Sequence, residues 1–227
     1  MVSLRSKMIE HEDDTTVSSP IDHGISPEIY RELFTSLELS VDSHPVIGIT
    51  SAISGEGRTT IATGLARTLA ADLDSLVSLV DADLDHPSLA EHFDLDTTVG
   101  LADVLRGERD LSSVTSLVAS NLCVIAAGAA GGETAALLHQ LSVSDPFHSR
   151  QGPRGVMIVD LPPILDHGYT SVSTQVADAV ILVVRAGVTP IEIVREAIAR
   201  LGDRPPHGVV LNGARSTLPS WWPEIGI

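Results

Sequence analysis

Residues 45–60 read Pro-Val-Ile-Gly-Ile-Thr-Ser-Ala-Ile-Ser-Gly-Glu-Gly-Arg-Thr-Thr. The β-branched run near the start of this stretch predicts a buried strand, because it is apolar and too short for a helix. A glycine-bearing loop and a helix start follow it. The spacing fits a phosphate-binding loop, in which alanine or glycine and four further residues precede Gly-Lys-Ser or Gly-Lys-Thr. Ala52, Gly57 and Thr59 occupy fixed positions of this pattern, but Arg58 stands where the lysine should be.

The loop has the backbone groups and the charge needed to bind a nucleoside triphosphate. Gly55 and Gly57 let the backbone turn sharply and approach a ligand closely, so that consecutive amides can form an anion nest. The helix predicted from residue 59 to about residue 73 adds its positive end. An ordinary glycine turn is the alternative. The predicted nucleotide-binding residues in this loop are Ser54, Gly55, Glu56, Gly57, Arg58, Thr59 and Thr60.

Arg58 changes what we expect of the chemistry. Its guanidinium keeps the positive charge of lysine but is longer, planar and forked. Binding of ATP should survive, because backbone amides do much of it, whereas transfer of the γ-phosphate should weaken, because it depends on the placement of charge. The sole lysine of the chain is Lys7. Two explanations for Arg58 are therefore open: a general drift from lysine toward arginine, or a selected loss of activity.

Acidic residues end two more apolar runs, at 75–81 and 156–160. The carboxyl ends of parallel strands face the ligand crevice of an open sheet, and Mg²⁺ prefers carboxylate and hydroxyl oxygens. The alternative role for such acids is capping of the next helix. We expect Asp85 and Asp94 to face solvent. The predicted metal ligands are Thr59, Asp81 and Asp160, and the predicted catalytic residues are Arg58, Asp81 and Asp83.

Apolar strands without polar alternation alternate with helices along the chain. This pattern predicts a single α/β P-loop domain over residues 26–215, with a mostly parallel sheet covered by helices on both faces. Residues 1–25 are predicted to be a disordered polar tail, and 216–227 a C-terminal tail. The predicted strands are 46–49, 75–81, 122–126, 156–160, 179–185 and 208–212; the predicted helices are 27–37, 59–73, 100–107, 133–141 and 189–201.

Composition narrows the function classes. A formal net charge of −16 argues against nucleic-acid binding and against direct attraction to anionic lipid. The chain shows no signal peptide and no apolar stretch of about 20 residues, and the nine histidines show no metal-binding spacing. A lone cysteine, Cys123, favours a reducing compartment. We therefore expect a cytoplasmic protein without membrane insertion, which a partner can recruit to the inner face of the membrane.

Trp221 and Trp222 stand side by side in a chain with only 3% aromatic residues. Tryptophan is favoured at the centre of protein interfaces, which makes the pair a candidate anchor for a partner. The alternative is that the two side chains fold back and cap the core.

These segments, in order, resemble the bacterial tyrosine kinases of polysaccharide biosynthesis of the CpsD/CapB type, which are P-loop ATPases related to MinD and ParA. The resemblance implies ATP and Mg²⁺ as cofactors and a membrane polysaccharide copolymerase-type adaptor as partner. It also implies self-association through the helix carrying Glu28 and Arg31, and a place for Asn212 near the base. The motifs that carry it are residues 28–31, 54–60, 79–84, 100–108, 158–163, 182–187 and 208–212.

The chain departs from that family in several places. Asp85 and His86 stand where the family usually has basic residues, and Phe34 where the association helix would carry a second arginine. The two tyrosines are Tyr30 and Tyr169, so the C-terminal tyrosine cluster of the family is absent.

The leading hypothesis is an ATP- and Mg²⁺-binding, tyrosine-kinase-like component of exopolysaccharide or capsule biosynthesis, with weakened phosphoryl transfer. One alternative is a catalytically inactive pseudokinase that acts as a scaffold. A MinD/ParA-like positioning ATPase is the other. Ile53 counts against the latter, because it occupies the position of that group's signature lysine.

Overall fold

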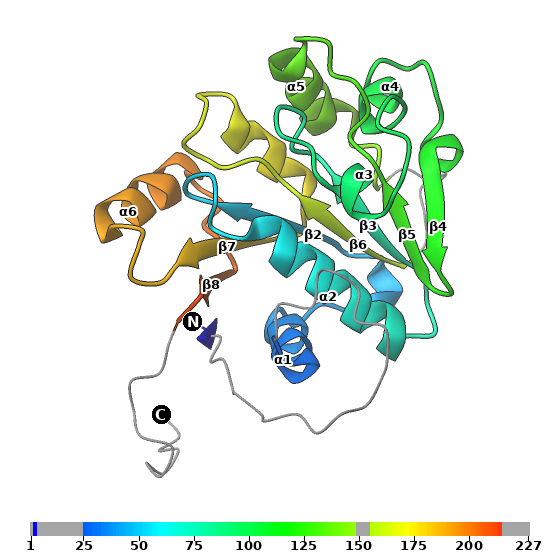
Figure 1. Ribbon diagram of the computed structural model, residues 1–227. Coiled ribbons are helices and arrows are strands. Elements are labelled where there is room, and N and C mark those ends of the chain that lie inside the picture. The colour runs from blue at the N-terminus through cyan, green and yellow to red at the C-terminus, as the bar shows by residue number, and fades with distance from the viewer. Residues whose placement is uncertain (1, 4–24, 149–154, 215–227) are drawn as a thin grey trace.

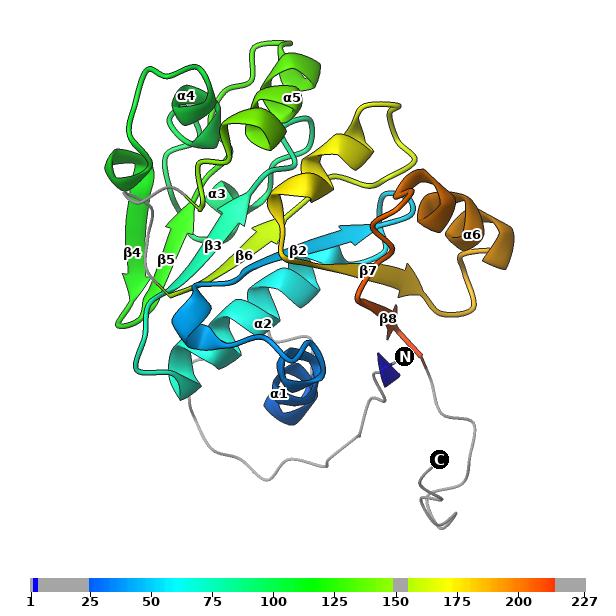
Figure 2. The same ribbon diagram turned by 180° about the vertical axis from the view of Figure 1, so that it is seen from behind.

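A computed structural model describes residues 2–3, 25–148 and 155–214. They form an eight-stranded sheet in the order β1-β8-β7-β2-β6-β3-β5-β4. All neighbouring strands are parallel except β4 and β5. Helices α1 and α2 lie on one face of the sheet, and α4 and α5 on the other (Figures 1 and 2). The predicted α/β P-loop architecture is therefore confirmed.

Every predicted strand and helix is present, with boundaries shifted by a few residues. The strands are β1 Val2–Ser3, β2 Val46–Ser51, β3 Val77–Asp81, β4 Thr115–Ala119, β5 Leu122–Ile125, β6 Val156–Asp160, β7 Ala179–Arg185 and β8 Gly208–Asn212. The α-helices are α1 Pro27–Ser36, α2 Arg58–Asp72, α3 Leu89–His92, α4 Leu101–Leu105, α5 Thr134–Ser144 and α6 Ile191–Arg200; 3-10 turns cover Val41–Ser43, Leu111–Val114 and Thr170–Val176.

The central strands are buried along their whole length. No residue of β2, β3 or β6 is exposed, because helices cover both faces and leave no side of these strands for polar residues. An aliphatic core under α1 and α2 includes Ile47, Ile61 and Leu65. A second aliphatic core, under α4 and α5, includes Val159 and Leu138.

The structure adds elements that the sequence pattern did not predict. Strand β4 pairs antiparallel with β5 at one edge, and its Leu117 is 67% exposed. It was missed because its intermediate and exposed positions lack the continuous apolar run of the central strands. At the other edge, Val2–Ser3 pairs with β8 within the expected polar tail. Pairing at a sheet edge uses main-chain groups, so it does not require an apolar pattern.

The strand order places the acidic residues beside the phosphate-binding loop. Strand β6 lies between β2 and β3, with Ile49 paired to Asp160 and Asp81 also paired to Asp160. Because these strands are parallel, the loops that follow them emerge at one edge of the sheet. This is where an open α/β sheet binds ligands.

Gly100, which precedes α4, packs directly against main chain. A Cβ atom there would lie 2.1 Å from the Ala126 carbonyl oxygen and 2.5 Å from the Gly128 nitrogen. We expect Gly100→Ala to lower the free energy of unfolding by about 2–3 kcal/mol, since the main chain must shift to admit the methyl group. Gly168→Ala is the matched control, because no atom lies within 4 Å of its added Cβ. Equal urea midpoints for the two variants would contradict this expectation.

Candidate nucleotide site

The phosphate-binding loop joins the end of β2 to the start of α2. Gly55 and Gly57 have positive φ angles of 82° and 93°, a region that glycine adopts without strain. A Cβ at Gly57 would lie only 2.2 Å from Asn212 Nδ2. Both conformation and space therefore require glycine at this position. Ser54 is exposed on the loop, and Thr60 is half-buried in the first turn of α2.

Arg58 is buried and directed toward the acidic residues. Its side chain is 9% exposed, and its Nη2 lies 2.7 Å from Asp83 Oδ2. Nη1 donates a hydrogen bond of 3.1 Å to Ser51 Oγ. Nε lies 3.9 Å from Asp160 Oδ1, too far for a hydrogen bond. In this structure the guanidinium is therefore the counter-ion of the carboxylates at the site.

Asp160 and Thr59 are joined by a hydrogen bond between their side chains. Thr59 Oγ1 donates to Asp160 Oδ2 at 2.5 Å. Burial is the main cause, and the nearby Asp81 carboxylate the second, of a pKa of Asp160 that is raised to about 7. Among the described residues, Asp160 Oδ1 and Arg58 Nε are buried without a hydrogen-bond partner. Such buried polar atoms without a partner are few in folded proteins, and Thr63 Oγ1 and Ser75 Oγ are the other two among the described residues.

Asp81 also anchors the chain that follows β3. Its Oδ2 accepts hydrogen bonds of 2.9 Å from the backbone amides of Ser88 and Leu89, and its Oδ1 accepts one of 3.2 Å from the Asp83 amide. Burial raises the pKa of Asp81 to about 6, although the Leu89 and Ser88 amides oppose that rise. Asp81 therefore caps the start of α3, which was the alternative role considered for it. It also lies next to Asp160 on the neighbouring strand.

The residues fit a magnesium site of the P-loop type. No group of three or more His, Cys, Asp and Glu side chains within the described ranges is arranged to hold a metal ion alone. Mg²⁺ in nucleotide sites needs few protein ligands, because phosphate and water complete its shell. The Thr59 hydroxyl and the Asp160 carboxylate, with its unpaired Oδ1, are oxygen groups that could fill such a role.

Glu56 and Asn212 hold the loop itself. The Glu56 side chain is 2% exposed, and its Oε2 accepts a 3.0 Å hydrogen bond from the Ile53 amide. Asn212 Nδ2 donates at 2.9 Å to the Glu56 carbonyl oxygen. The loop pattern predicted Glu56 as a nucleotide ligand, and the family resemblance implied a place near the base for Asn212. Here both side chains support the loop backbone.

Two of the four predicted partner residues, Glu28 and Arg31, belong to the part of the chain that the structure describes. Arg31 pairs with Asp72 at the end of α2, with contacts of 2.6 and 2.9 Å, and more weakly with Glu28 at 3.3 Å. Its guanidinium therefore joins α1 to α2 within this chain. Trp221 and Trp222 lie outside the described residues.

Ser51, Ser88 and Asp85 take part in the site or its rim in ways that the sequence did not predict. Ser88 Oγ lies 3.4 Å from Thr59 Oγ1. Asp85 is exposed as expected, but it also accepts hydrogen bonds from Thr134 Oγ1 at 2.6 Å and Tyr169 Oη at 3.2 Å. For Ser51, its position at the end of an apolar strand was the available signal. No sequence signal connects Asp85 to partners so distant along the chain.

Comparison with known proteins decides the family. The chain is 32% identical over 198 residues to the tyrosine-protein kinase YwqD of Bacillus subtilis (strain 168), a match that covers 85% of this chain and 83% of YwqD. The chain belongs to the bacterial tyrosine-protein kinase family. No protein-family model matches it.

Solved structures agree on the fold of this kinase family member. The kinase domain of the Escherichia coli tyrosine kinase ETK has a TM-score of 0.74 at 23% identity, and the match covers 94% of this chain and 86% of that one. The septum site-determining protein MinD of Pyrococcus horikoshii OT3, solved with Mg-ADP, has a TM-score of 0.60 at 22% identity, covering 74% of this chain and 69% of MinD. No helix within the described ranges is both long and apolar enough to cross a bilayer.

The raised carboxyl pKa values predict how stability depends on pH. Burial raises the pKa of Asp160 to about 7 and that of Asp81 to about 6, so the folded protein binds protons more tightly than the unfolded chain between about pH 4 and pH 7. The contribution of these groups to the free energy of unfolding is therefore present at low pH and is lost as the pH rises through the folded values.

Urea titrations without Mg²⁺ or nucleotide measure this effect, with Asp160→Asn as reference because it removes one of the two groups. Between pH 5 and pH 8 the wild type should lose on the order of 2 kcal/mol relative to that variant. Parallel pH profiles for the two proteins would contradict the assignment.

Proposed function

We propose that this chain is an ATP- and Mg²⁺-binding, tyrosine-kinase-like component of exopolysaccharide or capsule biosynthesis, with slow phosphoryl transfer. The observation that carries the proposal is the arrangement of Thr59, Asp160 and Arg58 at the mouth of a phosphate-binding loop. The protein would be cytoplasmic, and a copolymerase-type adaptor would recruit it to the membrane, as the family resemblance implies. Self-association through α1 belongs to the same proposal.

Each residue has a distinct role in this proposal. The amides of the loop and the first turn of α2 bind the phosphates. Thr59 and Asp160 hold Mg²⁺, which when bound neutralises charge on the phosphates. Asp81 orients the attacking hydroxyl or accepts its proton. A pKa raised to about 6 keeps this carboxylate mostly ionised at neutral pH while making it a better proton acceptor.

The position of Arg58 explains why transfer should be slow. To contact the γ-phosphate, the guanidinium must give up its ion pair with Asp83 and its hydrogen bond to Ser51. Both contacts are buried, so ATP must replace them with interactions of equal strength. Part of the binding free energy is therefore used to reorganise the site instead of stabilising the transition state.

Arg58 also supports the runner-up, a nucleotide-binding pseudokinase that acts as a scaffold. A guanidinium held by Asp83 can neutralise the acidic residues without taking part in transfer. Tyr30, one of the two tyrosines, is buried at 5% exposure, which limits tyrosine self-phosphorylation further. A positioning ATPase of the MinD/ParA kind remains a weaker alternative, with Ile53 at the position of the signature lysine.

Calorimetry with Mg·ATP and a phosphate-release assay, on the wild type and Arg58→Lys, test the proposal together. We expect the wild type to bind Mg·ATP and release phosphate slowly. The lysine variant should turn over at least tenfold faster, because an ammonium group does not form the forked contact to Asp83 and Ser51. Absence of binding in both proteins would refute the proposal. Turnover by the lysine variant alone would favour the pseudokinase.

A further inference from the structure

Glu56 carries a carboxylate within the proposed phosphate-binding loop. A negative side chain directed toward the phosphates would oppose ligand binding. Glu56 avoids this conflict because its side chain is buried, at 2% exposure, and turned toward the β7–α6 connection. A buried carboxylate is stable only when hydrogen bonds or charges compensate it. Its partners therefore show what this residue does.

Three donors compensate the Glu56 carboxylate. Oε2 accepts from the Ile53 amide, within the loop, at 3.0 Å. Oε1 accepts from the Arg185 amide at 3.0 Å and from the Thr189 hydroxyl. Two of the three donors thus come from the segment 185–189, which is more than a hundred residues away along the chain. The carboxylate joins that segment to the phosphate-binding loop.

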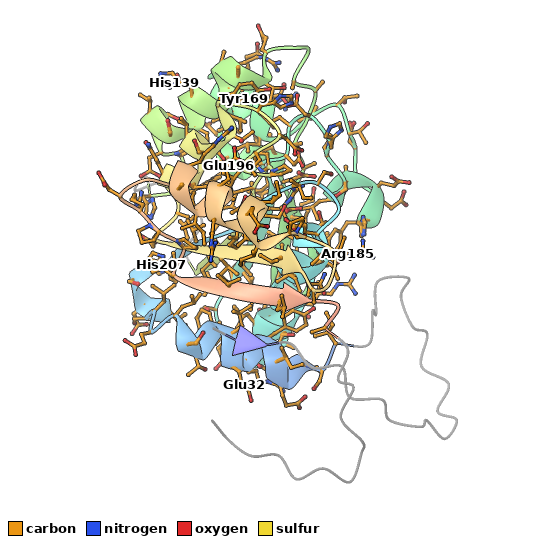
Figure 3. All side chains as sticks on the ribbon, turned by 90° about the vertical axis from the view of Figure 1, so that its left-hand side faces the viewer. Glu32, His139, Tyr169, Arg185, Glu196 and His207 are labelled. Atoms are coloured by element: carbon orange, nitrogen blue, oxygen red, sulfur yellow. The ribbon has the colours of Figure 1, made fainter. Side chains whose placement is uncertain are left out.

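Side chains at the ends of β7 and β8 also donate hydrogen bonds to the main chain of the loop. Arg185 Nη1 donates at 3.3 Å to the Gly55 carbonyl oxygen, and Asn212 Nδ2 donates at 2.9 Å to the Glu56 carbonyl oxygen. Figure 3 shows Arg185 at the end of β7. Between Arg185 and Thr189 the chain turns at Gly187, with φ of 69°, and exposes Val188 at 64%. The segment 185–189 is therefore bonded to the phosphate-binding loop on one side, and its Val188 is accessible to solvent on the other.

We propose that Glu56 is a positioning residue that couples the phosphate-binding loop to the segment 185–189, so that this segment controls nucleotide affinity. Displacing the segment removes two of the three donors and leaves a buried charge without compensation. The loop must then follow the segment or lose its shape. The inference rests on the proposed nucleotide binding, because it assigns the control of that same site.

Glu56→Ala and Glu56→Gln test the coupling through Mg·ATP affinity. The alanine variant should raise the Kd at least tenfold, since it removes every hydrogen bond of a charged acceptor. Glutamine keeps one acceptor oxygen but presents an amide donor to the other partners, so its Kd should lie between those of the wild type and the alanine variant. Glu196→Ala, on the exposed part of α6 (Figure 3), should leave the Kd within twofold of wild type.

Thr189 provides a matched pair on the other side of the contact. Thr189→Ser keeps the hydroxyl that donates to Glu56, whereas Thr189→Val keeps the shape and removes the donor. We expect Thr189→Val to raise the Kd for Mg·ATP about threefold to tenfold, and Thr189→Ser to stay near wild type. Equal values for valine and serine would overturn the role of this hydrogen bond.

Amide hydrogen exchange tests whether nucleotide binding at the loop also protects the segment 185–189. In the wild type, saturating Mg·ATP should slow exchange at Arg185 together with the amides of the loop. In Glu56→Ala, at saturating ligand, protection should remain in the loop and disappear at Arg185. Protection of both segments in both proteins would overturn the coupling.

The outcome without nucleotide separates this inference from the proposed function. If the wild type binds no Mg·ATP, the proposed function fails. The contact is then tested by exchange in the free protein, where Glu56→Ala should speed exchange at Ile53 and Arg185 together. Unchanged exchange at Arg185 would overturn the inference on its own.

Discussion

Arg58→Ala should lower the free energy of unfolding by about 3–5 kcal/mol at pH 8 in the absence of Mg²⁺ and nucleotide. The guanidinium contacts Asp83 at 2.7 Å and lies 3.9 Å from Asp160. Its removal leaves the buried carboxylates, including Asp81, facing one another without a cation. Urea denaturation measures the effect. The loss should be smaller at pH 6, because a raised pKa lets Asp160 take up a proton there.

Two further variants show whether charge is the cause. Arg58→Lys keeps the positive charge and should recover most of the lost stability. Arg195→Ala removes an exposed arginine from α6 and should change stability by less than about 0.5 kcal/mol. Mg²⁺ alone should stabilise Arg58→Ala more than it stabilises the wild type, since a divalent ion can replace the missing cation. A stable Arg58→Ala protein with no response to Mg²⁺ would contradict the role we assign to this side chain.

Asp160→Asn should lower Mg²⁺-dependent turnover about a hundredfold or more, whereas the folded protein becomes more stable at pH 8. The two effects have one origin. Burial makes ionisation of Asp160 unfavourable and raises its pKa to about 7, and asparagine removes that charge. The same substitution removes a carboxylate oxygen from the proposed metal site beside Thr59.

Phosphate release and thermal unfolding, measured on the same preparations, separate these effects. Mg·ATP should raise the unfolding temperature of the wild type and leave that of Asp160→Asn nearly unchanged. Asp94→Asn is the control, because Asp94 is exposed and its positive φ of 52° suits asparagine as well. Full turnover by Asp160→Asn would exclude Asp160 as a metal ligand.

The sequence predicted the fold and the convergence of the acids because both follow from local patterns. Long apolar runs ending in Asp81 and Asp160 define central parallel strands, and parallel strands bring their carboxyl ends to one edge. The edge strand β4 was not predicted, because its half-exposed residues carry no comparable pattern. Element boundaries moved by a few residues for the same reason: hydrogen bonds at element ends depend on neighbours distant in the chain.

The direction of individual side chains could not be predicted from the sequence. The phosphate-loop pattern requires a cation at Arg58 but does not specify whether it contacts a phosphate or a carboxylate. Glu56 fits the loop spacing, yet its partners Arg185 and Thr189 are determined by the packing of β7 against β2. Such contacts join residues far apart in sequence, and no local periodicity records them.

Helix α2 connects the proposed metal site to the helix α1, through which self-association is proposed. At one end it carries Thr59, and at the other Asp72, which is bound by Arg31 of α1. Fifteen residues of α-helix form a rod about 22 Å long. A subunit that binds to α1 would thus act on a rigid helix that ends at the Thr59 hydroxyl, the proposed metal ligand, and no loop lies between the two points.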